Sequence, residues 1–242
     1  VFSPEVIEHY KKEITGCVQK LNTLHLPMEQ RSIYQKAFLQ IMNLWTHSDV
    51  VKTFVMGHRL ARIATELLGC EGVRLYHDQA LYKEPGGGIT PWHADQHYWP
   101  LDSDRTVTAW IPLQATPSEM GPLAFSPGSF RILTGRDLGI SEESERKIQR
   151  SLKSYPVYEE PFDLGEVSFH SGWTFHRAGA NTTSLPREVM TIIFMDQNIR
   201  LTEPANKDQL NDRNTWCPGV EVGHVVDSPL NPVIYSKSSE AA

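Results

Sequence analysis

The pattern of apolar residues changes at about residue 72, and this change limits the folds that the chain can adopt. From there to about residue 200, short runs alternate between apolar and polar residues and are separated by turn signals rich in glycine, proline and serine. Examples are V-R-L-Y-H-D-Q-A-L-Y-K, V-T-A-W-I-P-L and E-V-M-T-I-I-F-M-D. A period of two is typical of β-strands. Several such strands in succession favour a sandwich or a barrel, so we expect a mainly β core.

The residues before this core have the spacing of helices. Apolar positions three and four apart predict a helix over residues 4–21, a second apolar periodicity over 29–45 and a third helix over 48–68. Residues 137–153 are charged and are predicted to be helical or to run over the surface. The proline-rich tail after about residue 200 is expected to be irregular. Because no linker or repeat interrupts the chain, we predict one domain with helices flanking the β core.

Composition excludes several classes of protein. With 40% hydrophobic and 21% charged residues among 242, the chain can bury a full core. Its net charge of −6 argues against a nucleic-acid binder. No apolar run approaches the roughly 18 residues that would cross a bilayer, and no leader is visible, although the chain begins at Val1 and a segment could be missing. Three scattered cysteines indicate a reducing compartment, so we predict a cytoplasmic protein; its oligomeric state is left open.

Residues 90–99, T-P-W-H-A-D-Q-H-Y-W, contain the strongest indication of chemistry. His93 and Asp95 are two apart and would point to the same face of an extended strand. His176, which ends a β-like run downstream, could supply a third ligand. Two histidines and one carboxylate on one face of a metal ion form the facial triad of non-haem Fe(II) oxygenases. Taken alone, however, an H-x-D pattern is more often a surface loop or a buried histidine.

Arg187 follows at the start of a predicted strand, eleven residues after His176. An oxygenase of this type needs a keto acid as co-substrate, and the planar guanidinium group can bind the distal carboxylate of such an acid with two parallel hydrogen bonds. Taken alone, Arg187 would be better interpreted as a solvated charge at a strand end.

Several motifs between residues 72 and 196 resemble, in order, the phytanoyl-CoA dioxygenase (PhyH) family of Fe(II)/2-oxoglutarate-dependent oxygenases. They are H-D-Q-A-L-Y-K-E-P-G-G-G, T-P-W-H-A-D-Q-H-Y-W-P, V-T-A-W-I-P-L, M-G-P-L-A-F-S-P-G-S and H-R-A-G-A-N-T-T-S-L-P-R. The resemblance implies a double-stranded β-helix, the cupin-like jelly roll. It implies that His93, Asp95 and His176 bind iron and that Arg187 binds 2-oxoglutarate.

The resemblance also implies which residues line the co-substrate pocket. Thr108 and Trp110 match a pocket strand of relatives and share one face of it, and Gln79 and Trp99 are weaker candidates for the wall. The chain departs from the family at Phe130, where relatives often have histidine after P-G-S. We expect Phe130 to lie at the entrance and not at the metal.

Three other histidines are rivals for the ligand roles. In an extended chain, His97 would lie about 13 Å beyond His93 on the same face, which fits the substrate side better than the metal. His170 is interpreted as a core histidine or one that supports a ligand. His77 precedes the glycine-rich turn and has no assigned role.

These residues predict oxidation of a small organic molecule, with Fe(II), 2-oxoglutarate and O2 as cofactor and co-substrates. Because related halogenases have a small residue at the position of Asp95, its carboxylate predicts hydroxylation. Epimerisation, desaturation or ring formation at the same iron, and a non-catalytic cupin-like binding module, remain alternatives. A zinc hydrolase fits less well, since no H-E-x-x-H is present.

An acyl-CoA substrate would need cations at the mouth of the pocket. Lys83, Arg105 and Arg131 could serve, but they are expected to be solvated surface charges.

Overall fold

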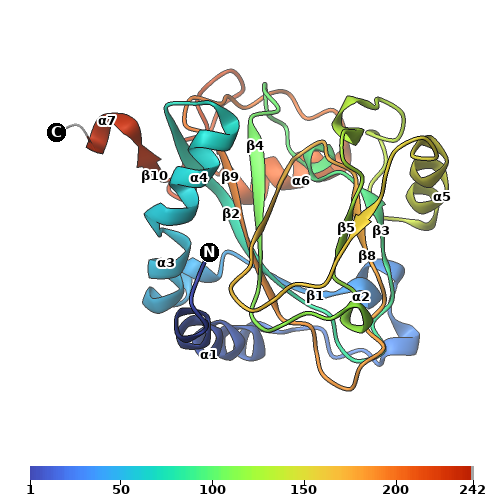
Figure 1. Ribbon diagram of the computed structural model, residues 1–242. Helices are drawn as coiled ribbons and strands as arrows, with labels where there is room; N and C mark the ends of the chain where they lie inside the picture. Colours follow the sequence, from blue (N-terminus) through green and yellow to red (C-terminus); the bar gives the residue numbers. More distant parts are fainter. Residues whose placement is uncertain (241–242) are drawn as a thin grey trace.

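The computed structural model describes residues 1–240, and its strands form two antiparallel sheets that face each other (Figure 1). The larger sheet has the order β1-β2-β9-β4-β7, and β10 also pairs with β2. Its strands are β1 (Leu39–Met42), β2 (Gly72–Tyr82), β4 (Thr106–Pro112), β7 (Ser168–Ser171), β9 (Val189–Asp196) and β10 (Val233–Ser236). The smaller sheet, in the order β3-β8-β5-β6, contains β3 (Thr90–His93), β5 (Leu123–Phe125), β6 (Tyr158–Glu159) and β8 (His176–Ala178). The molecule is therefore a jelly roll, as predicted.

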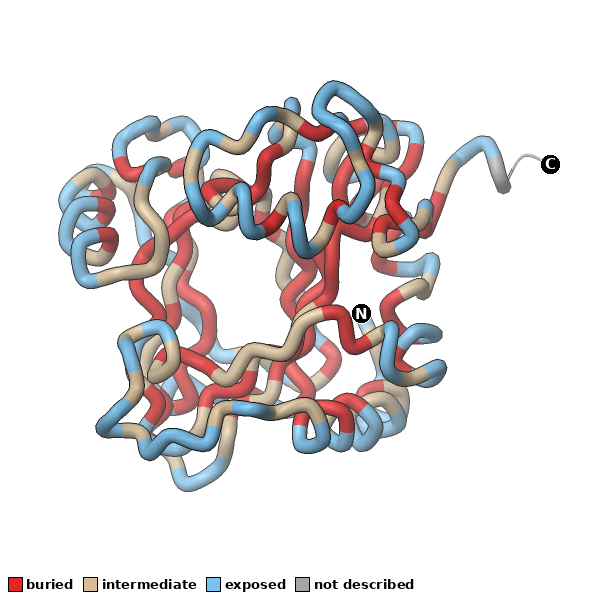
Figure 2. The backbone as a smooth tube through the Cα atoms, turned by 180° about the vertical axis from the view of Figure 1, so that it is seen from behind, coloured by how far each residue is buried: buried red, intermediate tan, exposed pale blue. Residues whose placement is uncertain are grey.

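Helices cover the outer faces of both sheets. The N-terminal layer consists of α1 (Pro4–Leu21), α3 (Asp49–Val55) and α4 (His58–Leu68), and it packs its apolar side chains against the larger sheet in one core (Figure 1). On the other side, α5 (Glu142–Ser151) lies against β3. Because β9 is central and covered on both faces, each of its residues is buried. Figure 2 shows the buried strands between these partly exposed helices.

The pleat of the larger sheet aims every second side chain into the space between the sheets. Consistent with this period of two, the residues that line the internal cavity include His77, Gln79 and Leu81 of β2 and Thr108 and Trp110 of β4. The strand pairing sets them level with one another. His77 and Thr108 both lie opposite Ile193 of β9, and Gln79 and Trp110 both lie opposite Thr191.

The N-terminal helices match the predictions in part. Helix 4–21 is confirmed. The periodicity over 29–45 gives only a short helix, α2 (Ile33–Ala37), after which the chain pairs with β2 as strand β1. The predicted helix 48–68 is interrupted at Gly57, where α3 ends and α4 begins, although Ser48 caps its start as expected. The apolar spacing in this segment fits a strand as well as a helix. The segment becomes a strand because it pairs with the edge of β2.

The tail differs from the predicted irregular segment. It contains α6 (Lys207–Trp216), strand β10 and the short α7 (Lys237–Glu240). The sequence K-D-Q-L-N-D-R-N-T-W has no apolar stripe, which is why a helix was not expected there. Among the described residues, no helix is long and apolar enough to span a membrane.

Candidate metal and co-substrate site

Strand pairing brings His93 and His176 together. They end β3 and begin β8, and they lie directly opposite each other in the antiparallel pair. Their ring centroids are 4.2 Å apart, and both side chains are buried. Two imidazoles that are 83 positions apart in the sequence therefore share one face of the smaller sheet.

Asp95 completes the cluster from a different local structure than predicted. Ala94 is extended, but Asp95 begins a 3₁₀ turn, η3 (Asp95–Tyr98), so strand geometry ends one residue earlier than expected. The Oδ1 atom of Asp95 is 3.6 Å from Nε2 of His93 and 3.6 Å from Nε2 of His176. Ligand atoms about 2.1 Å from one ion lie about 3.0–3.6 Å apart at angles between 90° and 120°. The three side chains therefore fit a single metal ion.

The second nitrogen of each histidine is also occupied in a way that suits metal binding. Nδ1 of His93 donates to the carbonyl of Pro91 at 2.7 Å, and Nδ1 of His176 donates to the carbonyl of Thr174 at 3.0 Å. Burial lowers the pKa of both imidazoles, which keeps them neutral. With the proton on Nδ1, the lone pair of Nε2 faces Asp95 and is free to bind a metal.

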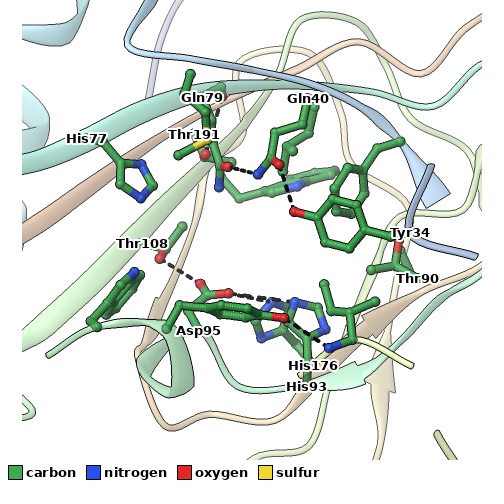
Figure 3. Close-up of a pocket in the computed structure, with 18 of the residues that line it drawn as sticks. Tyr34, Gln40, His77, Gln79, Thr90, His93, Asp95, Thr108, His176 and Thr191 are labelled. Atoms are coloured by element: carbon green, nitrogen blue, oxygen red, sulfur yellow. Dashed lines mark hydrogen bonds and ion pairs between the residues drawn. The ribbon is translucent and has the colours of Figure 1, made fainter. Parts of the chain in front are cut away.

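The other oxygen of Asp95 is held in place by two neighbours. Thr108 donates its hydroxyl proton to Oδ2 at 3.0 Å, and Nε2 of His170 lies 3.3 Å from the same atom (Figure 3). Burial alone would raise the pKa of Asp95, but His176, His170 and His93 together hold it well below its usual value. The carboxylate is thus ionised, and Oδ1 alone is directed at the shared position.

A cavity of about 410 Å³ opens from this cluster between the two sheets (Figure 3). All of the residues predicted for the site line it: His93, Asp95, His176, Arg187, Thr108, Trp110, Gln79 and Trp99. Residues that the sequence did not single out also line it, including Tyr34 and Gln40 near the N-terminus and four residues of α6. Tyr34 donates to Gln40, which in turn donates to Gln79. These contributors come from segments with no motif, so only the fold could identify them.

Arg187 occupies one end of the cavity and is 1% exposed. One Nη donates to the carbonyl of Gly121, the guanidinium lies over the ring of Trp110, and Nε has no partner among the described residues. Burial lowers its pKa to about 10, so the group still carries its charge at neutral pH. Within the described chain no carboxylate lies within ion-pair distance of Arg187, which leaves a buried positive charge open to an anion.

Lys83 lies opposite Arg187 in an isolated β-bridge and is fully buried, so the prediction that it is a surface charge is wrong. Its Nζ atom donates to the carbonyl of Gly88 and to the hydroxyl of Thr90. Arg105 and Arg131 are exposed as expected; Arg105 pairs with Asp196, and neither lines the cavity.

The rival histidines take three different places. His170 supports Asp95, in agreement with its interpretation. His97 does not extend along a strand, because η3 turns it away; it contacts the carbonyl of Arg136 and the carboxylate of Asp208 behind the wall of the cavity. His77 lines the cavity directly. Phe130 is exposed and is not among the cavity-lining residues, so it lies away from the metal cluster as expected but does not form the entrance.

Comparison with known proteins agrees with this geometry. A sequence profile of the phytanoyl-CoA dioxygenase (PhyH) family matches residues 1–189, more than three quarters of the chain. The chain belongs to the phytanoyl-CoA dioxygenase family. This match includes both histidines of the cluster, Asp95 and Arg187, and it ends before α6.

A curated relative from Stutzerimonas stutzeri is described as a probable alpha-ketoglutarate-dependent hypophosphite dioxygenase. It is 25% identical to this chain over an alignment of 170 positions, which covers 65% of the chain and 57% of the relative. The chain thus spans little more than half the length of the curated relative that it matches.

Solved structures share the fold at lower identity. The carbocyclase SnoK from nogalamycin biosynthesis superposes with a TM-score of 0.78 at 24% identity, over 97% of this chain and 89% of SnoK. The epimerase SnoN gives 0.76 at 21% identity, over 95% and 86%. EctD from S. alaskensis, solved with 2-oxoglutarate and 5-hydroxyectoine, gives 0.68 at 20% identity, over 84% and 72%. These likenesses establish the jelly roll.

Proposed function

We propose that this protein is a non-haem Fe(II)/2-oxoglutarate-dependent dioxygenase that hydroxylates a C–H bond of a small organic substrate. The observation that carries the proposal is the pairing, in one cavity, of a two-histidine, one-carboxylate cluster with a buried arginine that has no carboxylate partner. A bound iron would activate O2, with 2-oxoglutarate oxidised to succinate and CO2 as the source of two electrons.

The residues of the chain divide the remaining work between them. His93, Asp95 and His176 would bind the metal on one face and leave its other positions open to the cavity. Thr108 and His170 fix the carboxylate of Asp95 so that one oxygen faces the metal. Arg187 would bind the distal carboxylate of 2-oxoglutarate and so orient the keto acid, while the buried walls exclude bulk water.

The presence of Asp95 favours hydroxylation over halogenation, because its carboxylate fills the position that a halide would need. The buried positive charge of Arg187 argues against a non-catalytic binding module, which would have no need of a carboxylate slot. Three free, buried cysteines support a reducing, cytoplasmic location.

The test is to add Fe(II) and 2-oxoglutarate to the purified protein without oxygen and to look for the violet absorbance of their complex. Asp95→Ala should abolish this absorbance and substrate-coupled succinate formation, because a metal ligand is lost. The exposed Asp227→Ala is the matched control and should behave like the wild type. Normal succinate formation by Asp95→Ala would contradict the assignment.

A further inference from the structure

The cavity continues past the metal cluster to α6, and what this end binds can be inferred if the proposed function holds. Four residues of α6 line it: Asp208, Asn211, Asp212 and Trp216. Their spacing of three or four places them on one face of the helix. Because the family profile ends at residue 189, this wall lies outside the matched segment and can give the chain a substrate preference of its own.

The two ends of the cavity differ in charge. Of the described lysines and arginines, only Arg187 lines the cavity, and it lies opposite Lys83 at one end of β2. His77 is six residues away along the same strand, a separation of about 20 Å. There its imidazole faces Trp216 of α6, at 5.6 Å between ring centroids. The α6 end therefore has two carboxyl groups and lacks a lysine or arginine among its lining residues.

Asp212 is buried with only partial compensation for a charge. Its Oδ2 accepts a hydrogen bond from Tyr76 at 3.1 Å. Burial raises its pKa to about 7, although the hydrogen bonds from Tyr76 and Trp216 act against this shift. Asp208 lies one turn earlier on the same face, so the two carboxyls repel each other when both are ionised. A cation beside them would offset both the burial of the charge on Asp212 and its repulsion by Asp208.

An unpartnered imidazole faces the same space. His77 is 4% exposed, its Nδ1 has no hydrogen-bond partner among the described residues, and its ring points into the cavity in Figure 3. Burial lowers its pKa to about 3, so it stays neutral and does not compete with a cationic ligand. The extra residue at Tyr76, where the pairing of β2 with β9 shifts, lets Tyr76 reach Asp212 while His77 faces the cavity. A buried imidazole without a partner indicates that a polar ligand belongs here.

We propose that the α6 end of the cavity binds a protonated amine of the substrate, with the carboxylates of Asp208 and Asp212 as its counter-charges. Aromatic rings surround this position: Tyr98, Trp99 and Trp216 all line the cavity. Rings and carboxylates together suit an organic ammonium group better than a metal ion, which would need more oxygen ligands. The neutral imidazole of His77 accepts or donates one further hydrogen bond to the same ligand.

The same charges disfavour anionic substrates. A CoA thioester would bring phosphate groups, and hypophosphite is itself an anion; either would meet two carboxyl groups at this end. This chain is therefore expected to differ in substrate from the hypophosphite dioxygenase that it resembles.

The test uses three probes of equal size and different charge: benzylamine, benzyl alcohol and benzoate. Each is titrated at pH 8 into protein that holds Fe(II) and 2-oxoglutarate without oxygen, and binding is followed by tryptophan fluorescence, since Trp99 and Trp216 line the site. Benzylamine should bind about tenfold or more tightly than benzyl alcohol, and benzoate should bind most weakly. Equal affinity for the three probes, or preference for benzoate, would overturn the proposal.

Charge-neutral variants test the named carboxylates. Asp212→Asn should weaken benzylamine binding about tenfold or more, because a buried counter-charge is lost. Asp208→Asn, whose carboxylate is half exposed, should weaken it about two- to fivefold. The exposed Asp227→Asn is the control and should change nothing. Unchanged amine selectivity in Asp212→Asn would overturn the proposal. Absence of the violet absorbance in the wild type would instead overturn the proposed function, so the two failures are distinguishable.

Discussion

Two buried basic residues, Lys83 and Arg187, lie opposite each other in a β-bridge at one end of the cavity. Like charges directly opposite in a sheet are destabilising, and burial adds to the cost. Of this pair, Arg187 remains charged at neutral pH, because its pKa falls only to about 10. Burial, reinforced by the charge of Arg187, lowers the pKa of Lys83 to about 6, so the lysine is largely neutral there. This end of the cavity is therefore suited to binding an anionic group, such as the distal carboxylate of the co-substrate.

Arg187→Gln should raise the half-saturating concentration of 2-oxoglutarate about a hundredfold, because the charge that binds its distal carboxylate is lost. The measurement is a titration of the violet Fe(II)–2-oxoglutarate absorbance without oxygen. Arg105→Gln, which removes an exposed arginine with a carboxylate partner, is the control and should leave the titration unchanged. An unchanged half-saturating concentration in Arg187→Gln would count against the anchor role.

Lys83 should make stability depend on pH in a predictable direction. Its pKa is about 6 in the folded protein and about 10.4 when unfolded. Between these values the unfolded chain binds more protons, so stability rises with pH. The free energy of unfolding of the wild type, relative to Lys83→Met, should therefore increase by about 1 kcal/mol per pH unit between pH 6 and 9. Denaturant titrations measure it; the exposed Lys12→Met should show no such trend, and a flat difference for Lys83→Met would refute the assignment.

Sequence alone could identify His93, Asp95, His176 and Arg187, because short-range spacing and family motifs mark them. It could not place Lys83, since a lysine after a strand is usually solvated and only the bridge to Arg187 shows that it is buried. The roles of these residues in binding metal and co-substrate remain predictions that the variants test.

Among the secondary-structure elements, the strands that form the cavity were predictable and its covering helix was not. A period of two in β2 and β4 fixes which side chains face inward. In contrast, α6 has polar residues on all sides, because one face lines the cavity instead of packing into an apolar core. The break between α3 and α4 cannot be predicted from the apolar spacing, because that spacing continues across Gly57 although the helical backbone is interrupted there.

Gly121 joins two elements that the site depends on. It has φ = +68°, and a Cβ there would lie 2.2 Å from the carbonyl oxygen of Gly179, just after β8. Its own carbonyl accepts the hydrogen bond from Arg187. Gly121→Ala should therefore lower the free energy of unfolding by about 3 kcal/mol or more, since backbone would have to move. The substitution should also raise the half-saturating concentration of 2-oxoglutarate, because the carbonyl that accepts from Arg187 would be displaced.

Gly219 provides the matched control for this prediction. It too has a positive φ, of +79°, but nothing lies within 4 Å of a Cβ placed on it. Gly219→Ala should lower the free energy of unfolding by only about 1 kcal/mol, the cost of backbone strain, without any change in co-substrate affinity. Equal losses in the two variants, measured by denaturant unfolding, would show that the contact with Gly179 is not restrictive.

At the scale of the whole molecule, the cavity lies between two sheets, and central strands such as β4 and β9 are buried throughout, so ligands that bind there should stabilise the entire fold (Figure 2). A ligand at a hundred times its Kd adds about 2.7 kcal/mol to stability. For a chain of this length that corresponds to a rise in Tm of about 5–10 °C.

Mn(II), used in place of iron to avoid oxidation, should therefore raise the Tm, and 2-oxoglutarate should raise it further. The two variants should differ in these rises in Tm. Asp95→Ala should lose both the Mn(II) and the 2-oxoglutarate increment, because the keto acid also chelates the metal. Arg187→Gln should keep the Mn(II) increment and lose most of the 2-oxoglutarate increment. Scanning calorimetry at matched ligand concentrations measures these shifts. If 2-oxoglutarate stabilised Arg187→Gln as much as the wild type, the distal carboxylate would have to bind elsewhere, and the division of the cavity into a cationic co-substrate end and an acidic substrate end would fail with it.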